Sequence, residues 1–171
     1  MTRFDNLADA GERLAQALSP DPDSVVLAIL PNGVPGALSI AQRHGLPVFG
    51  VRLERGYLVQ VADLAVSGDG TSADVSLADR PVIVVDDGVE TGSAALVVGK
   101  ALRDFGAGPL TLAVPVCPRE GEATLTPLYD AIVAIERPMV RRSLRWHYTD
   151  FDVLDESEAL RRLAAHPSSL G

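Results

Sequence analysis

Two adjacent aspartates, Asp86 and Asp87, directly follow an apolar run at residues 81–85. Paired carboxylates can accept hydrogen bonds from the neighbouring hydroxyl groups of a sugar, or can hold a divalent cation through water. Their position predicts that they stand at the open end of a buried segment. An isolated Asp-Asp-Gly string is also common in plain turns, so the acids alone leave a turn or a helix cap open as alternatives.

The residues that follow the acids suit an anion. Gly88 and Gly92 allow the backbone to approach a ligand closely, while Thr91 and Ser93 add hydroxyl donors. Helical spacing begins at Ser93, so the loop is expected to lead into a helix whose first N–H groups and dipole favour a phosphate. The acids can bind two neighbouring hydroxyl groups, and the backbone N–H groups beside them can bind a phosphate. Together they are typical of a site for a sugar phosphate.

Alternating patterns along the chain predict the elements that position this loop. Continuous apolar runs predict buried strands, and a spacing of 3.6 residues predicts helices. The expected strands are residues 24–30, 47–53, 81–85, 110–116 and 131–135, with 57–66 as an extended edge strand and 67–70 as a turn. The expected helices are residues 4–18, 35–44 ending at Gly45, 93–105, and 156–165 capped by Asp155.

This alternation predicts an α/β fold with a doubly wound, mainly parallel sheet and helices on both faces. In such sheets ligands bind outside the carboxyl ends of the strands. Two loops would lie there, residues 31–36 and 86–93. The length of 171 residues predicts one domain spanning residues 1–171.

Charge and composition narrow the classes of function. The net charge of −8 argues against a nucleic-acid partner or an acidic membrane surface, because both need a basic face. No apolar run is long enough to span a bilayer, and the first residues lack a secretory signal pattern, so we expect a cytoplasmic protein. Cys117, the one cysteine, lies in an apolar run and is expected in the core, which agrees with a reducing compartment.

A longer string around the acids resembles a known motif. Residues 82–95, VIVVDDGVETGSAA, resemble the phosphoribosyl-pyrophosphate motif of the type I phosphoribosyltransferases: four apolar residues, two acids, a short variable stretch, then Thr-Gly and a small hydroxyl residue. LPNGVPGA at 30–37 lies where that family has its pyrophosphate loop. LAVPVC at 112–117 and WHYTDF at 146–151 resemble a stand-alone bacterial branch with unassigned acceptors. The resemblance covers most of the chain and implies the fold of that family.

The resemblance also implies a reaction. The donor would be phosphoribosyl pyrophosphate with Mg²⁺, and a nucleobase or another small nitrogen acceptor would displace pyrophosphate at C1. Asp86 and Asp87 would hold the ribose hydroxyls and, through these or water, the metal, with Glu90 assisting as a base. The implied substrate-binding residues are Asp86, Asp87, Gly88, Val89, Glu90, Thr91, Gly92, Ser93, Ala94, Asn32, Gly33, Val34 and Arg52. The expected edge strand favours a homodimer, and so does the resemblance, because members of that family commonly form dimers.

Three features depart from the family pattern. Asn32 stands where the pyrophosphate loop of the family often carries Arg or Lys. The family often has a basic residue after the strand expected at 47–53, and Arg52 and Arg55 are both candidates for it. Residues 67–79 are expected to form a short hairpin where the family has a long closing loop. These departures keep open a non-catalytic module that binds the donor or a nucleotide. A phospho-acceptor receiver domain is disfavoured, because the acids lie mid-chain and the sole lysine is Lys100.

The late part of the chain holds a basic and aromatic cluster. Its members are Arg137, Arg141, Arg142, Arg145, Trp146 and Tyr148. Arginines beside aromatic rings can bind a phosphate or stack on a base, but internal salt bridges or a subunit contact are the favoured interpretation. His147 is expected to pack inside, and His44 to end its helix, where a cation suits the dipole.

Overall fold

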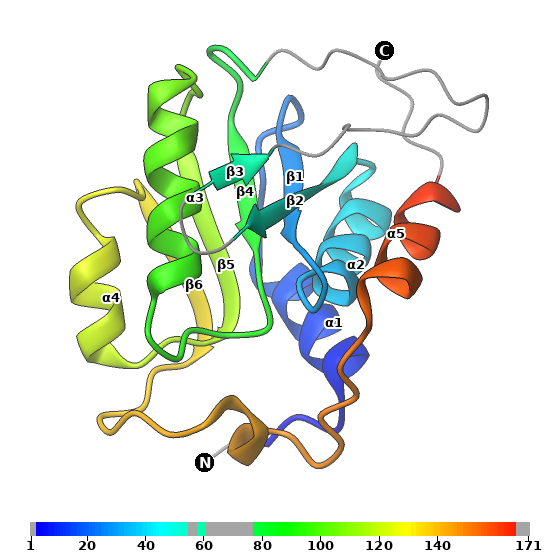
Figure 1. The fold of residues 1–171 in the computed structure, drawn as a ribbon, viewed down its shortest axis with the longest axis vertical. Coiled ribbons are helices and arrows are strands. Elements are labelled where there is room, and N and C mark those ends of the chain that lie inside the picture. Colours follow the sequence, from blue (N-terminus) through cyan, green and yellow to red (C-terminus); the bar gives the residue numbers. More distant parts are fainter. Residues whose placement is uncertain (1–2, 55–57, 61–76, 167–171) are drawn as a thin grey trace.

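The computed structural model describes residues 3–54, 58–60 and 77–166, and within them a six-stranded sheet lies between two groups of helices (Figure 1). The strand order is β3-β2-β1-β4-β5-β6. The strands are β1 (Val25–Ile29), β2 (Val48–Glu54), β3 (Leu58–Gln60), β4 (Val82–Val85), β5 (Leu110–Val116) and β6 (Ala131–Glu136). All neighbours pair in parallel except β3, which is antiparallel to β2. The predicted doubly wound, mainly parallel sheet is confirmed.

The helices cover both faces of this sheet. They are α1 (Leu7–Ala17), α2 (Val34–His44), α3 (Ser93–Asp104), α4 (Arg119–Leu125), the 3-10 helix η1 (Leu144–His147) and α5 (Glu156–Ala164). Alternate residues of β1 divide the core, because successive side chains of a strand point to opposite faces. Leu27 packs in the cluster that includes Val98 of α3, whereas Ala28 packs with Ile40 of α2 and Ala159 of α5. No described helix is long and apolar enough to cross a membrane.

The connections after β1 and β4 place the site. These strands are neighbours, yet β1 leads into α2 on one face of the sheet and β4 leads into α3 on the other. Chains that leave adjacent strands toward opposite faces open a crevice at the carboxyl edge, which is where ligands bind in such sheets. The two loops predicted at 31–36 and 86–93 therefore meet at this switch point.

Most predicted boundaries agree with the structure to within one residue, and the exceptions are the first helix, α4 and the strand expected at 57–66. The first helix begins at Leu7 rather than at residue 4, because Asn6 caps it by accepting a 2.9 Å hydrogen bond from the Asp9 N–H. Phe4 instead forms a β-bridge with Tyr148. Helix α4 was not predicted, because seven residues are too few to show a clear period. Of the strand expected at 57–66, residues 58–60 form β3, and the other residues lie outside the described part of the chain. The turn expected at 67–70 and most of the hairpin expected at 67–79 also lie outside it.

Several local predictions are confirmed. Gly45 ends α2 in the left-handed conformation, with φ of 65°, and its N–H bonds to Ala41. Asp155 caps α5 by accepting from the Glu158 N–H at 2.8 Å. Cys117 and His147 are buried. The ends of the two helices therefore follow from the local sequence. The burial of Cys117 and His147 depends instead on how distant parts of the chain pack together.

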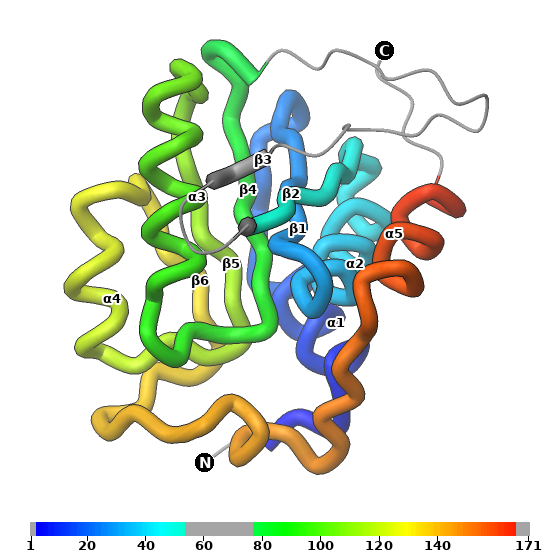
Figure 2. The backbone as a smooth tube through the Cα atoms, in the orientation of Figure 1, coloured from blue at the N-terminus to red at the C-terminus, as the bar shows by residue number. Residues whose placement is uncertain are grey.

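Between β6 and α5 the chain crosses the carboxyl edge of the sheet, drawn in orange in Figure 2. We call residues 137–155 the crossover segment. It is joined to the start of the chain, since the Phe4 N–H donates to the His147 carbonyl at 2.9 Å and the Thr149 N–H donates to the Phe4 carbonyl at 2.7 Å. Asp152 accepts from the Leu7 N–H at 2.9 Å. These bonds hold the crossover segment against the edge that carries the switch point.

Candidate active site

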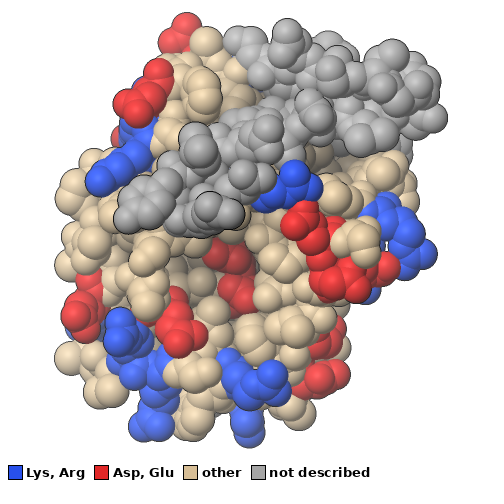
Figure 3. Space-filling view, viewed as in Figure 1, with Lys and Arg blue, Asp and Glu red and all other residues tan. Residues whose placement is uncertain are grey.

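A pocket of about 170 Å³ lies at this edge, between the loop after β4 and the crossover segment. Its lining residues are Asp86, Asp87, Gly88, Val89, Glu90, Thr91, Gly92, Ser93, Ala94, Ala95, Val114 and Leu144. The predicted stretch 86–94 lines it without a gap, and the structure adds residues from the first turn of α3, from β5 and from η1. Figure 3 shows acidic side chains within a hollow on this face.

The acid pair is held where few polar partners surround it. Asp86 is half-buried, and Asp87 is 9% exposed. Burial raises the pKa of both carboxyl groups, and the neighbouring charge of Asp87 helps to raise the pKa of Asp86 well above its usual range. Among the described residues, neither forms an ion pair with Lys, Arg or His. Such a pair favours a ligand that supplies hydroxyl donors or a cation.

Hydrogen bonds to main-chain groups fix the loop that carries the acids. The Asp87 N–H donates to the Asp86 carboxylate at 2.8 Å, and the Val89 N–H donates to the Val116 carbonyl at 2.8 Å. The Tyr148 hydroxyl donates to the Asp87 carbonyl at 2.7 Å. The loop is thus tied to β5 and to the crossover segment before any ligand arrives.

The second half of the loop is suited to an anion. Gly92 has φ of 82° and precedes α3 without a side chain that could cap it, and the Ser93 N–H, the first of the helix, donates a long 3.3 Å hydrogen bond to the Thr91 hydroxyl. The start of the helix, with its dipole, suits an anion. The Thr91 and Ser93 hydroxyls lie 3.1 Å apart, and both side chains are exposed. Gly88 has φ of 144°, and a Cβ there would lie 2.5 Å from Leu144. The conformation of residue 88 favours glycine, whereas the space around it is closed only by the flexible end of the Leu144 side chain.

Glu90, the predicted base, lies at the rim of the pocket. Its side chain is exposed, and its carboxylate accepts a 3.4 Å hydrogen bond from the Leu144 N–H. The contact places a carboxylate between the loop and the crossover segment. Leu144 carried no signal of its own in the sequence, because a single leucine in an irregular stretch has no periodic pattern.

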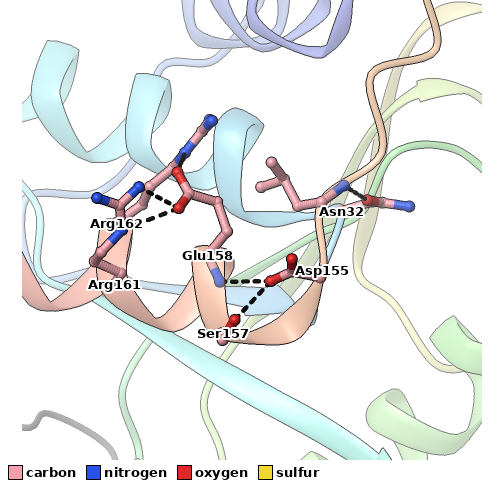
Figure 4. Close-up of polar contacts among 7 residues, drawn as sticks. Asn32, Asp155, Ser157, Glu158, Arg161 and Arg162 are labelled. Carbon is pink, nitrogen blue, oxygen red and sulfur yellow. Dashed lines mark hydrogen bonds and ion pairs between the residues drawn. The ribbon is translucent and has the colours of Figure 1, made fainter.

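The remaining predicted site residues do not line the pocket. The Asn32 amide lies close enough to the Asp87 carboxylate to lower the pKa of that group, and its Oδ1 accepts from the Leu154 N–H at 2.9 Å, beside the start of α5 (Figure 4). Gly33 and Val34 are buried where α2 begins. Arg52 forms an ion pair with Glu156 of α5. Asn32 is therefore connected to the pocket through Asp87, and Arg52 is held by another partner.

The carboxylates of the acid pair are possible ligands for a metal ion. Among the described residues, no group of three or more His, Cys, Asp or Glu side chains could hold one. Asp86 and Asp87 offer two carboxylates without a basic partner. Mg²⁺ commonly takes one or two protein carboxylates and fills its other positions with water and substrate oxygens. The pair fits a Mg²⁺ ion that the substrate helps to bind.

The arginine cluster divides into two groups. Arg137 pairs with Glu122 at 3.1 Å and donates to the carbonyl groups of Ile132 and Ala134 on β6, which is the internal role favoured from the sequence. Farther along, arginines stack on aromatic rings: Arg142 lies over Trp146 and Arg145 over Phe151.

Comparison with known proteins agrees with this geometry. The model of the phosphoribosyl transferase domain family matches residues 3–144. Two Mycobacterium tuberculosis proteins, "Putative phosphoribosyl transferase Rv0571c" of strain H37Rv and its counterpart MT0597 of strain CDC 1551, are each 26% identical over 205 aligned residues and cover 94% of this chain. The chain spans 46% of the length of these relatives, about half.

Solved structures show the same fold. TT1426 from Thermus thermophilus superposes with a TM-score of 0.79 at 22% identity, over 95% of this chain and 98% of that one. A purine phosphoribosyltransferase from Pyrococcus horikoshii gives 0.55 at 18% identity, over 87% and 92% of the two chains. An orotate phosphoribosyltransferase from Aeropyrum pernix gives 0.54 at 26% identity, over 74% and 69%.

Proposed function

Because the chain belongs to the phosphoribosyl transferase domain family, we propose that it transfers a phosphoribosyl group from phosphoribosyl pyrophosphate to a nitrogen atom of a nucleobase or another small acceptor. One observation carries this proposal: a single loop lines the pocket with the acid pair Asp86 and Asp87 and then with the start of α3, where the N-cap residue is Gly92. A ribose phosphate presents vicinal hydroxyls and an anion a few bonds apart, so it matches both parts of the loop.

Each part of the loop has a role in binding the donor. Ionised Asp86 and Asp87 accept hydrogen bonds from the 2′- and 3′-hydroxyls of the ribose. The leading N–H groups of α3, with the hydroxyls of Thr91 and Ser93, donate to the 5′-phosphate. The glycines of the loop leave room for these phosphate oxygens. Donor binding therefore needs no basic side chain at the phosphate.

The chemistry follows from this orientation. The acceptor nitrogen forms a bond to C1 as the bond from C1 to the pyrophosphate oxygen breaks, and the proton on nitrogen leaves to Glu90 or to water. Glu90 suits this role, because its exposed carboxylate lies at the rim. Asp86 and Asp87 would hold Mg²⁺, which when bound helps to neutralise the leaving pyrophosphate.

A second candidate is a module that binds the donor or a nucleotide without turnover. No basic residue is among those that line the pocket in the described part of the chain, and Asn32 is engaged by Asp87 and Leu154. A pyrophosphate leaving group would then lack a charge-assisted contact there. Release of pyrophosphate on addition of an acceptor separates the two candidates.

Calorimetry of phosphoribosyl pyrophosphate, with and without Mg²⁺, tests the proposal. We expect metal-dependent binding to wild type that the double variant Asp86→Asn/Asp87→Asn loses. Asp104→Asn makes the same change at an exposed position at the far end of α3 and should bind as wild type does. A folded wild type that does not bind the donor would refute the proposal. The single domain, the homodimer and the cytoplasmic location stay predictions, which size measurement and localisation would check.

A further inference from the structure

Three arginines of the crossover segment lie within three residues of one that lines the pocket. Arg141, Arg142 and Arg145 flank Leu144, which lines the pocket and donates its N–H to Glu90. All three side chains are exposed. Figure 3 shows basic side chains along the lower edge of this face, beneath the acidic hollow, and Figure 1 draws the crossover segment along the same edge. Positive charge is thus gathered beside a pocket whose own charges are negative.

These arginines are not neutralised by the carboxylates around them. Among the described residues, Arg141, Arg142 and Arg145 make no ion pair. The arginines that do are Arg13, Arg52, Arg103, Arg137, Arg161 and Arg162. The whole chain carries 23 acidic and 15 basic residues, so acidic partners are in excess. Exposed guanidinium groups without such partners favour the binding of an anion.

Arg142 is also held in a defined orientation. Its guanidinium carbon lies 4.6 Å from the centroid of the Trp146 ring, which is 38% exposed. The Trp146 ring in turn meets His147 edge-on at 5.3 Å, and His147 is 1% exposed. Stacking orients the plane of a guanidinium and leaves its N–H groups free to bind a carboxylate or phosphate in pairs. The packing of η1 therefore preorganises an anion-binding group two residues from the pocket-lining Leu144.

The pocket lining explains why an anion would need this rim. The lining includes Asp86, Asp87 and Glu90 but no basic residue. In the proposed function the acids bind the ribose hydroxyls and the metal ion. They would repel an anionic group on the acceptor. We propose that the acceptor carries an anionic group, a carboxylate or a phosphate, which Arg142 binds while Arg141 and Arg145 add positive charge. This assignment to an acceptor rests on the proposed function, but the anion site does not.

Trp146 gives the experiment its signal, because it is the only tryptophan of the chain. Its fluorescence is titrated with nicotinate, with nicotinamide, which has the same ring without the charge, and with phenyl phosphate, each with and without Mg²⁺ and donor. We expect saturable binding of nicotinate or phenyl phosphate that is tighter than that of nicotinamide by about tenfold. The anion that binds better identifies the acidic group as carboxylate or phosphate.

Variants separate this site from general charge effects. Arg142→Ala should weaken anion binding by about tenfold, and Arg142→Lys should keep only part of the affinity, since lysine does not present paired donors. Lys100→Ala removes one positive charge from an exposed position on α3 and should change nothing.

Three results would overturn the inference. The first is equal binding of the charged and uncharged probes, and the second is anion binding that Arg142→Ala leaves intact. The third is weaker calorimetric binding of phosphoribosyl pyrophosphate to Arg142→Ala, which would assign the arginine to the donor. The proposed function fails in a different measurement, if calorimetry detects no donor binding to wild type. The fluorescence titration tests the anion site independently of that result.

Discussion

The Tyr148 hydroxyl donates a 2.7 Å hydrogen bond to the main-chain carbonyl of Asp87, a residue 61 positions earlier in the chain. Both residues are buried, Tyr148 at 1% and Asp87 at 9% exposure. The bond holds the backbone from which the Asp87 carboxylate projects. The geometry of the acid pair therefore depends on the crossover segment as well as on its own loop.

Tyr148→Phe removes this bond and leaves a buried carbonyl without its partner. We expect the free energy of unfolding to fall by about 1 kcal/mol and donor binding to weaken. Tyr129→Phe is the matched control, because its hydroxyl makes an equally short buried bond, to the Ala95 carbonyl within α3. It should lose similar stability and keep more of the affinity. Denaturant unfolding and calorimetry measure the two effects, and an unchanged donor affinity in Tyr148→Phe would contradict the prediction.

Asn32→Asp should move donor binding to higher pH. The Asn32 amide lies close to Asp87 and lowers the pKa of that carboxyl group, against the larger upward effect of burial. A carboxylate at position 32 removes the donor and adds a like charge, so Asp87 keeps its proton to higher pH. Asn32→Ala removes the donor without the charge and should shift binding less. Calorimetric titrations across a pH series measure the midpoint, and one midpoint for all three proteins would exclude this role.

Asp86→Asn should stabilise the unliganded protein at neutral and alkaline pH. The pKa of Asp86 is raised in the folded protein, mainly by burial. A raised carboxyl pKa means that the folded state binds more protons than the unfolded state, so stability falls as pH rises from the unfolded pKa through the folded pKa. Asparagine does not ionise and avoids this loss.

We expect a gain of roughly 1–2 kcal/mol at pH 8 that shrinks toward pH 4, measured by denaturant unfolding at both pH values. Asp104→Asn, at an exposed position, is the control and should show no such trend. A gain that is constant with pH, or a loss that grows with pH, would disprove the assignment. Donor binding should be lost in the same stabilised variant, as expected of a site that sacrifices stability for function.

Gly33→Ala should disrupt the switch point. A Cβ at residue 33 would lie 2.3 Å from the Val85 carbonyl oxygen and 2.6 Å from that of Ile29, so the ends of β1 and β4 would have to move apart. We expect a loss of about 3 kcal/mol in the free energy of unfolding. Gly45→Ala meets no atom within 4 Å but has φ of 65°, and should cost about 1 kcal/mol. Equal losses in the two variants would show that the close approach at Gly33 is relaxed easily.

Much of the fold could be predicted because its signals are local. The strands at 110–116 and 131–135 are continuous apolar runs, and the structure places them within one residue of the expected bounds. The pocket-lining stretch 86–94 follows a buried strand and precedes a helix, so its place at the carboxyl edge follows from the order of elements. Asn32 and Arg52 could be predicted near that edge, but their partners Leu154 and Glu156 could not.

The sequence by itself determined the alternation of strands and helices and the loop that carries the acids, because hydrophobic period and turn residues act over a few positions. Only the tertiary structure decided how that loop is closed. Tyr148, Leu144 and the arginines beside it come from an irregular segment, and no local pattern tells which distant residues such a segment contacts. The raised pKa of Asp86 has the same origin, since burial is set by packing between elements far apart in the chain.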